Sequence, residues 1–171
     1  MAESNGTGGT SESSERKETG GASAAPGVGA AGGVGIRAAG VAEVERVLEF
    51  WRTAAEGTSV SDDVAGVAGL VARDPEALLL AECGGELVGT VIAGFDGWRC
   101  HLYRLAVAPG WRRRGVASAL LAAAEARFAA LGGRRADAMV LLRNESARAA
   151  WSANGYGPEA HWQRWVKPLP R

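Results

Sequence analysis

Three consecutive arginines, Arg112–Arg114, stand directly before Gly115 at a point where the pattern of the sequence changes. Before them, Leu102–Val107 alternates apolar and other residues, which is typical of a half-buried strand, and the turn Ala108–Gly110 follows. After them, from Ala117 on, the apolar residues have helical spacing. The first N–H groups of a helix lack intrahelical acceptors and carry partial positive charge. A strand, a basic turn, a glycine and a helix start therefore predict a site for a phosphate-bearing ligand.

The small residues of this stretch support that interpretation. Gly115 allows a phosphate to approach the backbone closely, and Ala117 keeps the start of the helix open. No GK[ST] follows, so a nucleotide P-loop with bound magnesium is not supported. The alternative for the arginines is a solvated basic helix start. A nucleic-acid site using Trp111 and the arginines is a further alternative, but the net charge of +0 and the lack of a second basic patch count against it.

The remaining elements must position this stretch, and they alternate in type along the chain. Residues 35–39 predict a strand, 41–55 an amphipathic helix, and 61–73 a second helix beginning at Ser61, Asp62 and Asp63. Residues 76–95 predict a hairpin around Gly84-Gly85, followed by the strand 101–107 and a helix over about 116–131. A buried strand at 136–142, a short helix opened by Asn144 and Ser146 and a last strand at 161–169 complete the order. The pattern predicts an α/β fold with one mixed sheet flanked by helices.

Composition divides the chain into a tail and one domain. Residues 1–34 contain almost no large apolar side chains, so we expect a disordered Gly/Ser/Ala-rich tail, with the domain at 35–171. Cys83 and Cys100 lack CxxC spacing and form no metal-ligand pattern with His101 and His161, so we expect buried, reduced thiols and no metal. The N-terminus has no apolar signal segment, and no apolar run approaches the ~20 residues of a membrane span. A cytoplasmic protein without membrane or nucleic-acid partners is the expectation.

The chain resembles the GCN5-related N-acetyltransferase (GNAT) superfamily over about residues 35–171, most closely its small stand-alone bacterial members. The resemblance rests on Arg112–Ala117, which matches (Q/R)-x-x-G-x-(G/A) after "LAVAP", and on Asn144 and Ala147 of an N-x-x-A helix that is followed by Gly155-Tyr156. It implies a single mixed, mostly antiparallel sheet. It also implies an acetyl-CoA-dependent N-acetyltransferase that moves the acetyl group directly, in a ternary complex, to a primary amine of a small molecule or a protein or peptide. A catalytically silent acyl-CoA-binding sensor is the alternative.

The resemblance also implies where the cofactor lies. Backbone groups of Leu105 and Val107 would pair with the pantetheine arm as an added strand does. Asn144 would contact the cofactor, although a helix N-cap is its structural alternative. Trp151 stands where many members have a tyrosine that protonates the thiolate, so we expect it to pack along the pantetheine. The pyrophosphate would contact Arg112, Arg113, Arg114, Gly115, Val116, Ala117 and Ser118.

Three positions are candidates for the chemistry. The resemblance implies a backbone N–H near Val107 as the donor to the thioester oxygen. His101 lies where some members have a glutamate that acts as the base, and imidazole as a residue type suits that task. A structural histidine is the alternative, and Glu82 and Tyr103 are other candidates for the base. Tyr156 is a candidate proton donor or a packing residue. For the acceptor amine we expect contacts from Trp51, Trp98 and Tyr103. The sequence leaves a monomer and a homodimer both open.

Overall fold

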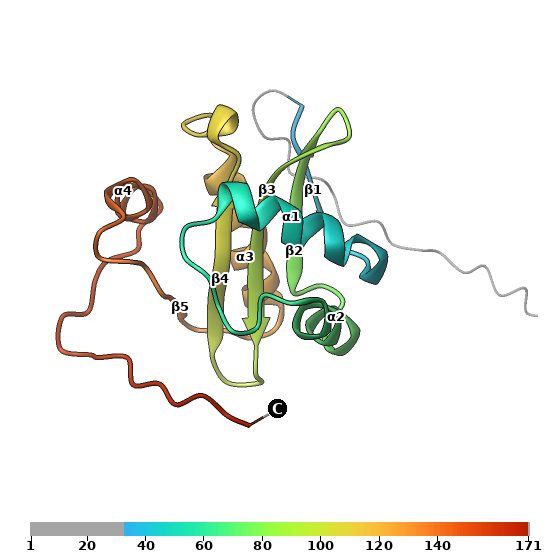
Figure 1. Cartoon of the computed structure of the whole chain (residues 1–171). Coiled ribbons are helices and arrows are strands. Elements are labelled where there is room, and N and C mark those ends of the chain that lie inside the picture. The colour runs from blue at the N-terminus through green and yellow to red at the C-terminus, as the bar shows by residue number, and fades with distance from the viewer. Residues whose placement is uncertain (1–32, 171) are drawn as a thin grey trace, which may run out of the picture.

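A five-stranded sheet forms the centre of the computed structural model, which describes residues 33–170 (Figure 1). The strands are β1 (Gly35–Ala38), β2 (Leu78–Cys83), β3 (Glu86–Phe95), β4 (Cys100–Val107) and β5 (Ala136–Ala138), and they lie in that order across the sheet. Neighbours from β1 to β4 are antiparallel, whereas β5 runs parallel to β4. The predicted fold class, a single mixed and mostly antiparallel sheet with flanking helices, is confirmed.

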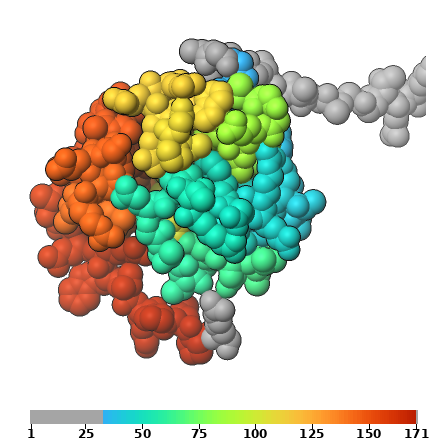
Figure 2. Space-filling view, turned by 45° about the horizontal axis from the view of Figure 1, so that its top comes forward, coloured from blue at the N-terminus to red at the C-terminus, as the bar shows by residue number. Residues whose placement is uncertain are grey.

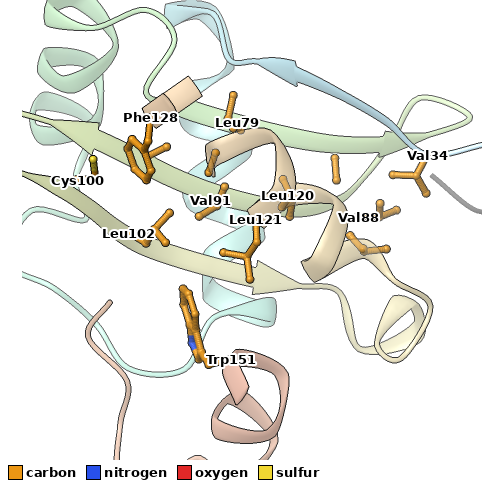
Figure 3. Close-up of a cluster of buried hydrophobic side chains, with 14 residues drawn as sticks. Val34, Leu79, Val88, Val91, Cys100, Leu102, Leu120, Leu121, Phe128 and Trp151 are labelled. Atoms are coloured by element: carbon orange, nitrogen blue, oxygen red, sulfur yellow. The ribbon is translucent and has the colours of Figure 1, made fainter. Parts of the chain in front are cut away.

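Helices cover both faces of the sheet and produce two cores. On one face α1 (Val44–Ala54) and α2 (Val64–Arg73) bury their apolar sides against Leu78 and Leu80 of β2. On the other face α3 (Val116–Ala130) buries Leu120, Leu121 and Phe128 against β3 and β4 (Figure 3). The shorter α4 (Glu145–Ala153) lies beyond β4 and adds Trp151 to this second core. The two helices predicted before the hairpin and the two predicted after it therefore form, although the first α-helix begins at Val44 and the second at Val64.

Local turn chemistry explains the connections. Gly84 and Gly85, with φ of 57° and 84°, form the turn between β2 and β3. Between β3 and β4, the Asp96 carboxylate accepts hydrogen bonds from the N–H groups of Trp98 and Arg99 at 2.8 and 2.7 Å. The α2 N-cap is Asp63, whose carboxylate accepts the Gly66 N–H at 2.7 Å.

Three sequence-based expectations need correction or fall outside the description. The last strand expected at 161–169 does not form. Its apolar residues are not spaced by two, Pro168 has no N–H to donate, and Trp165 is 90% exposed. The strand expected at 136–142 is limited to Ala136–Ala138, and Leu142 is 87% exposed. Residues 1–32, most of the expected tail, lie outside the described residues, while Val34 is already buried in the core.

A bulge divides β4 into two parts. Thr90 of β3 pairs with Ala106 and Ile92 pairs with Tyr103, so two β4 residues, Arg104 and Leu105, face a single β3 residue. Arg104 takes up the extra length with a φ of 51°. Before the bulge, Leu102 packs on the α3 side; after it, Ala106 packs on the α1 and α2 side. The alternation expected over 102–107 is therefore interrupted at Arg104.

Strands β4 and β5 separate close to this bulge. Pairing with β5 ends at Leu102, so in the described part of the chain the outer edge of β4 from Tyr103 to Val107 has no strand beside it. The chain instead continues from β5 to α4, which stands away from this edge in Figure 1. The sheet consequently opens beside the turn that leads into α3.

Candidate functional site

The turn before α3 contains two residues in the left-handed region of backbone conformation. Gly115 is the N-cap of α3 with a φ of 80°, and Arg113 has a φ of 60°, whereas Arg112 has a φ of −63°. Arg112 itself is extended, with a ψ of 150°, so two left-handed residues, Arg113 and Gly115, turn the chain into α3. Backbone N–H groups in such a turn conformation can form a concave site for an anion. The N–H groups at the start of the 15-residue α3 add to it. This geometry supports the predicted phosphate site.

A cleft of about 370 Å³ joins this turn to the open edge of β4. Its walls are the last residue of α1 and Glu56 two residues beyond it, the second half of β4, the turn and first residues of α3, and one side of α4. In Figure 2 the yellow turn, the turquoise segment after α1 and the orange α4 meet on one face of the molecule. Segments that are far apart in the sequence are thus assembled around a single opening.

Most residues predicted to bind the cofactor line this cleft. They are Leu105, Val107, Arg112, Arg113, Gly115, Val116, Ala117, Ser118, Asn144 and Trp151. Arg114 does not line it, and its guanidinium lies 5.3 Å from the ring centre of Trp111. The structure therefore brings together residues from β4, α3 and α4 that the sequence could group only by resemblance.

Arg112 differs in use from its neighbours. Its Nε donates to the Val107 carbonyl at 3.2 Å, and its Nη2 donates to the Ala54 carbonyl at 3.4 Å. Ala54 is the last residue of α1, where carbonyl groups lack intrahelical donors. Arg112 thus fastens α1 to the end of β4. Arg113 lines the cleft on the same turn.

Two residues of α4 form the far wall. The side-chain oxygen Oδ1 of Asn144 accepts the Ala147 N–H at 2.7 Å, so the structural alternative, an N-cap, is observed. Asn144 also borders the cleft. Trp151 is 8% exposed, and its ring extends from α4 toward Leu121 and β4 (Figure 3). It therefore contributes to the core and to the wall of the cleft at once, as its predicted packing role requires.

Tyr156 is held outside the cleft. Its hydroxyl donates to Glu125 on α3 at 2.8 Å, and its ring packs edge-on against Trp151 with ring centres 4.9 Å apart. Burial and the Glu125 carboxylate raise the pKa of the Tyr156 hydroxyl above its ordinary value. The structure gives this residue a packing geometry and does not bring it to the predicted proton-donor position.

The other candidate side chains lie apart from the cleft. His101 is near the start of β4, with Nε2 3.7 Å from the Asp96 carboxylate and its ring centre 6.0 Å from that of Tyr103. Trp98 is 77% exposed on the turn before β4, and the Arg99 guanidinium lies 4.5 Å from its ring centre. Glu82 pairs with Arg37 and Arg46, which hold the pKa of its carboxyl below the usual range. None of these borders the cleft.

Trp51 is buried at 5% exposure, so its role is to support the site from within. Its indole N–H donates to the Thr90 hydroxyl at 2.9 Å, and this hydroxyl donates to the Arg104 carbonyl at 3.0 Å. The chain of bonds satisfies the carbonyl group that the bulge removes from regular pairing. Sequence reasoning missed Thr90 and Arg104; the only available signal was a threonine and an arginine within otherwise apolar strands.

A second, larger groove of about 1340 Å³ runs along β5, the end of α3 and the other side of α4. Trp162 and Arg164 of the C-terminal segment line part of it. Among residues 33–170, no group of His, Cys, Asp and Glu is placed to hold a metal ion. Over the same residues, no helix has the length and apolar character that crossing a membrane requires.

Comparisons with known proteins agree with this geometry. The profile of the Acetyltransferase (GNAT) family matches residues 42–156. An acetyltransferase of Pectobacterium atrosepticum is 33% identical over 104 residues, which are 61% of this chain and 74% of that protein. The crystal structure of the PaiA N-acetyltransferase of Thermoplasma acidophilum in complex with coenzyme A superposes with a TM-score of 0.66 at 17% identity, covering 75% of this chain and 92% of that one.

The aminoglycoside N-acetyltransferase AAC(6')-Iy, in complex with the bisubstrate analogue CoA-S-monomethyl-acetylneamine, has a TM-score of 0.65 and 19% identity. The structural similarity covers 81% of this chain and 100% of the AAC(6')-Iy chain. At such identities the two structures establish the common fold.

Proposed function

The chain belongs to the GNAT family of acetyltransferases and is an N-acetyltransferase, and we propose that it transfers the acetyl group of acetyl-CoA directly to a primary amine of a small molecule or peptide. The observation that carries the proposal is the 370 Å³ cleft, which joins the unpaired edge of β4 to the anion-binding start of α3. A pantetheine arm needs backbone partners and a pyrophosphate needs converging N–H donors. The cleft offers an unpaired strand edge for the pantetheine and helix N–H donors for the pyrophosphate next to each other.

The residues present fit this co-substrate. The N–H groups of Gly115–Ser118 would hold the pyrophosphate, with Arg113 adding charge at the rim. Leu105 and Val107 would offer their backbone to the pantetheine, because β5 leaves β4 after Leu102. Trp151 closes the opposite wall and keeps water from that side. When bound, acetyl-CoA supplies a thioester acyl group.

The chain's own part in the chemistry is to position and stabilise. A backbone N–H near Val107 would donate to the thioester oxygen, where negative charge develops as the amine attacks. No side-chain acid is needed in this proposal: Tyr156 is bonded to Glu125, and Trp151 has only an indole N–H. The acceptor attacks as the neutral amine, after its ammonium proton has passed to water. The C–S bond then breaks, coenzyme A leaves as the thiolate, and the second proton lost from nitrogen passes through water to solvent or to the thiolate, whose thiol has an ordinary pKa.

The proposal is tested by binding and turnover in the same preparation. Thermal shift with acetyl-CoA and thiol release over a panel of primary amines should both be positive in the wild type. Ser118→Glu places a negative charge at the start of α3, where it favours the helix but repels a pyrophosphate. We expect it to preserve the melting temperature and to raise the Kd for acetyl-CoA by about tenfold or more.

The matched control is Ala126→Glu, an exposed position eight residues further along α3. At ~1.5 Å per residue the added charge lies about 12 Å from the cleft, beyond a Debye length at ordinary salt. Equal acetyl-CoA affinity in the two variants would show that the cofactor binds elsewhere. Binding by the wild type without turnover on any amine would instead favour the silent sensor.

A further inference from the structure

Glu56 occupies a position at the cleft that no other carboxylate shares. It follows α1 by two residues, its side chain is exposed, and it borders the cleft together with Leu105–Val107 of β4. Among the described residues that line the cleft, the other ionisable side chains are Arg112 and Arg113, both cationic. A negative charge is thus present in a cleft that the unpaired part of β4 also lines.

The backbone on both sides of Glu56 is anchored. Arg112 donates to the Ala54 carbonyl at 3.4 Å on one side, and Arg104 Nη1 donates to the Gly57 carbonyl at 3.0 Å on the other. Gly57 has a φ of 75°, a conformation that glycine adopts without strain. Glu56 is therefore held over the strand and is not on a freely moving loop.

Arg104 is itself well fixed, which makes the anchor effective. Its side chain is 12% exposed, its Nε donates to Asp62 at 2.8 Å, and its guanidinium lies 5.4 Å from the ring centre of Trp51. Its backbone is the β4 bulge that opens the cleft. One residue thus shapes the edge where the acyl group would bind and fixes the segment that carries Glu56.

We propose that Glu56 is the carboxylate that selects the acceptor, by binding the ammonium group of a cationic primary amine beside Leu105–Val107. The inference rests on the proposed function and adds the residue that would bind the ammonium group of the acceptor. Primary amines are cationic at neutral pH, since their pKa is near that of lysine, about 10.4. A carboxylate forms charge-assisted hydrogen bonds with such a group, and these are stronger than bonds between neutral groups. The bound ammonium group must pass a proton to water before its nitrogen attacks the thioester, so Glu56 would act in binding the acceptor and not in the attack itself.

The test compares wild type with Glu56→Gln, which keeps size and hydrogen-bonding capacity but removes the charge. Neamine, 1,4-diaminobutane and a lysine tripeptide are titrated calorimetrically into each protein with and without saturating coenzyme A. Glu49→Gln is the control, because Glu49 is an exposed α1 residue, paired with Arg52, that does not line the cleft. For amines bound by wild type, we expect Glu56→Gln to weaken binding by about 10- to 100-fold and Glu49→Gln to leave it within about twofold.

The results that would overturn the role of Glu56 differ from the result that would refute the proposed function. Binding of none of the three amines by wild type, or equal binding by wild type and Glu56→Gln, would overturn the role of Glu56. A parallel loss of coenzyme A affinity in Glu56→Gln would also overturn it, because the residue would then support the cofactor. Failure of wild type to bind coenzyme A at all would refute the proposed function, while the titrations without coenzyme A would still report on Glu56.

Discussion

Gly89 of β3 links the packing of the sheet to the cofactor cleft, and Gly89→Ala tests that link. A Cβ atom at Gly89 would lie 2.9 Å from Val116 Cγ1 and from Leu120 Cδ1, and 3.2 Å from the Ala106 carbonyl oxygen. Carbon atoms pack best at ~3.5–4.0 Å, so relief requires a shift of about 0.6 Å or more. Both apolar partners belong to α3, which must move as a body, and Val116 is its first residue.

Two effects are expected from this shift. Overpacking of a core costs about 1–3 kcal/mol, which at roughly 3 °C per kcal/mol lowers the melting temperature by about 3–9 °C. The same movement displaces the N–H groups at the start of α3, so the Kd for acetyl-CoA should rise by about threefold or more, because small misplacements of binding groups are costly. Differential scanning calorimetry and titration calorimetry measure the two quantities.

Gly94→Ala in the same strand is the matched control. There the nearest atom to an added Cβ is the His101 carbonyl oxygen at 3.8 Å, an ordinary contact distance. The change should be neutral or stabilising by up to ~1 kcal/mol, because alanine restricts the unfolded chain. Equal melting temperatures for the two alanine variants would refute the contact argument, and a destabilised Gly89→Ala with unchanged acetyl-CoA affinity would refute the coupling to the cleft.

Two further predictions concern the proton-transfer candidate and the response to acid. Tyr156→Phe should cost about 1 kcal/mol of stability through loss of the bond to Glu125 and should keep most of kcat; a hundredfold drop in kcat at unchanged KM would restore Tyr156 as the proton donor. Hydrogen bonds from Arg37, above all, hold the pKa of Glu43 at about 2 instead of the usual 4.5. A depressed folded-state pKa adds stability above pH 4.5 that is lost as the pH falls toward 2, so the melting temperature should decline over that window, and less steeply in Glu43→Gln. Parallel curves of melting temperature against pH for wild type and Glu43→Gln would contradict this role of Glu43.

Patterns that depend on near neighbours could be predicted from the sequence. The helical spacing of Leu120, Leu121 and Phe128 places one face of α3 in the core, and the observed helix ends one residue from the expected limit. Gly84-Gly85 and Asp96-Gly97 specify turns through their own backbone and side-chain preferences. The anion-binding turn was predictable for the same reason, since Gly115 and the start of the helix are contiguous in the chain.

The remaining features of the fold and the site depend on contacts between residues that are far apart in the sequence. Nothing local in Leu102–Val107 shows a bulge at Arg104, because its conformation depends on Thr90 accepting from Trp51 and donating to the Arg104 carbonyl. His101 is a reasonable base by residue type, yet the strand carries it toward the far end of β4 from the cleft. Glu56 has no sequence motif at all, and it reaches the cleft only because Arg104 and Arg112 fasten its backbone there. Periodicity and turn preference act over a few residues, whereas register and ion pairing join residues that only the folded chain brings together.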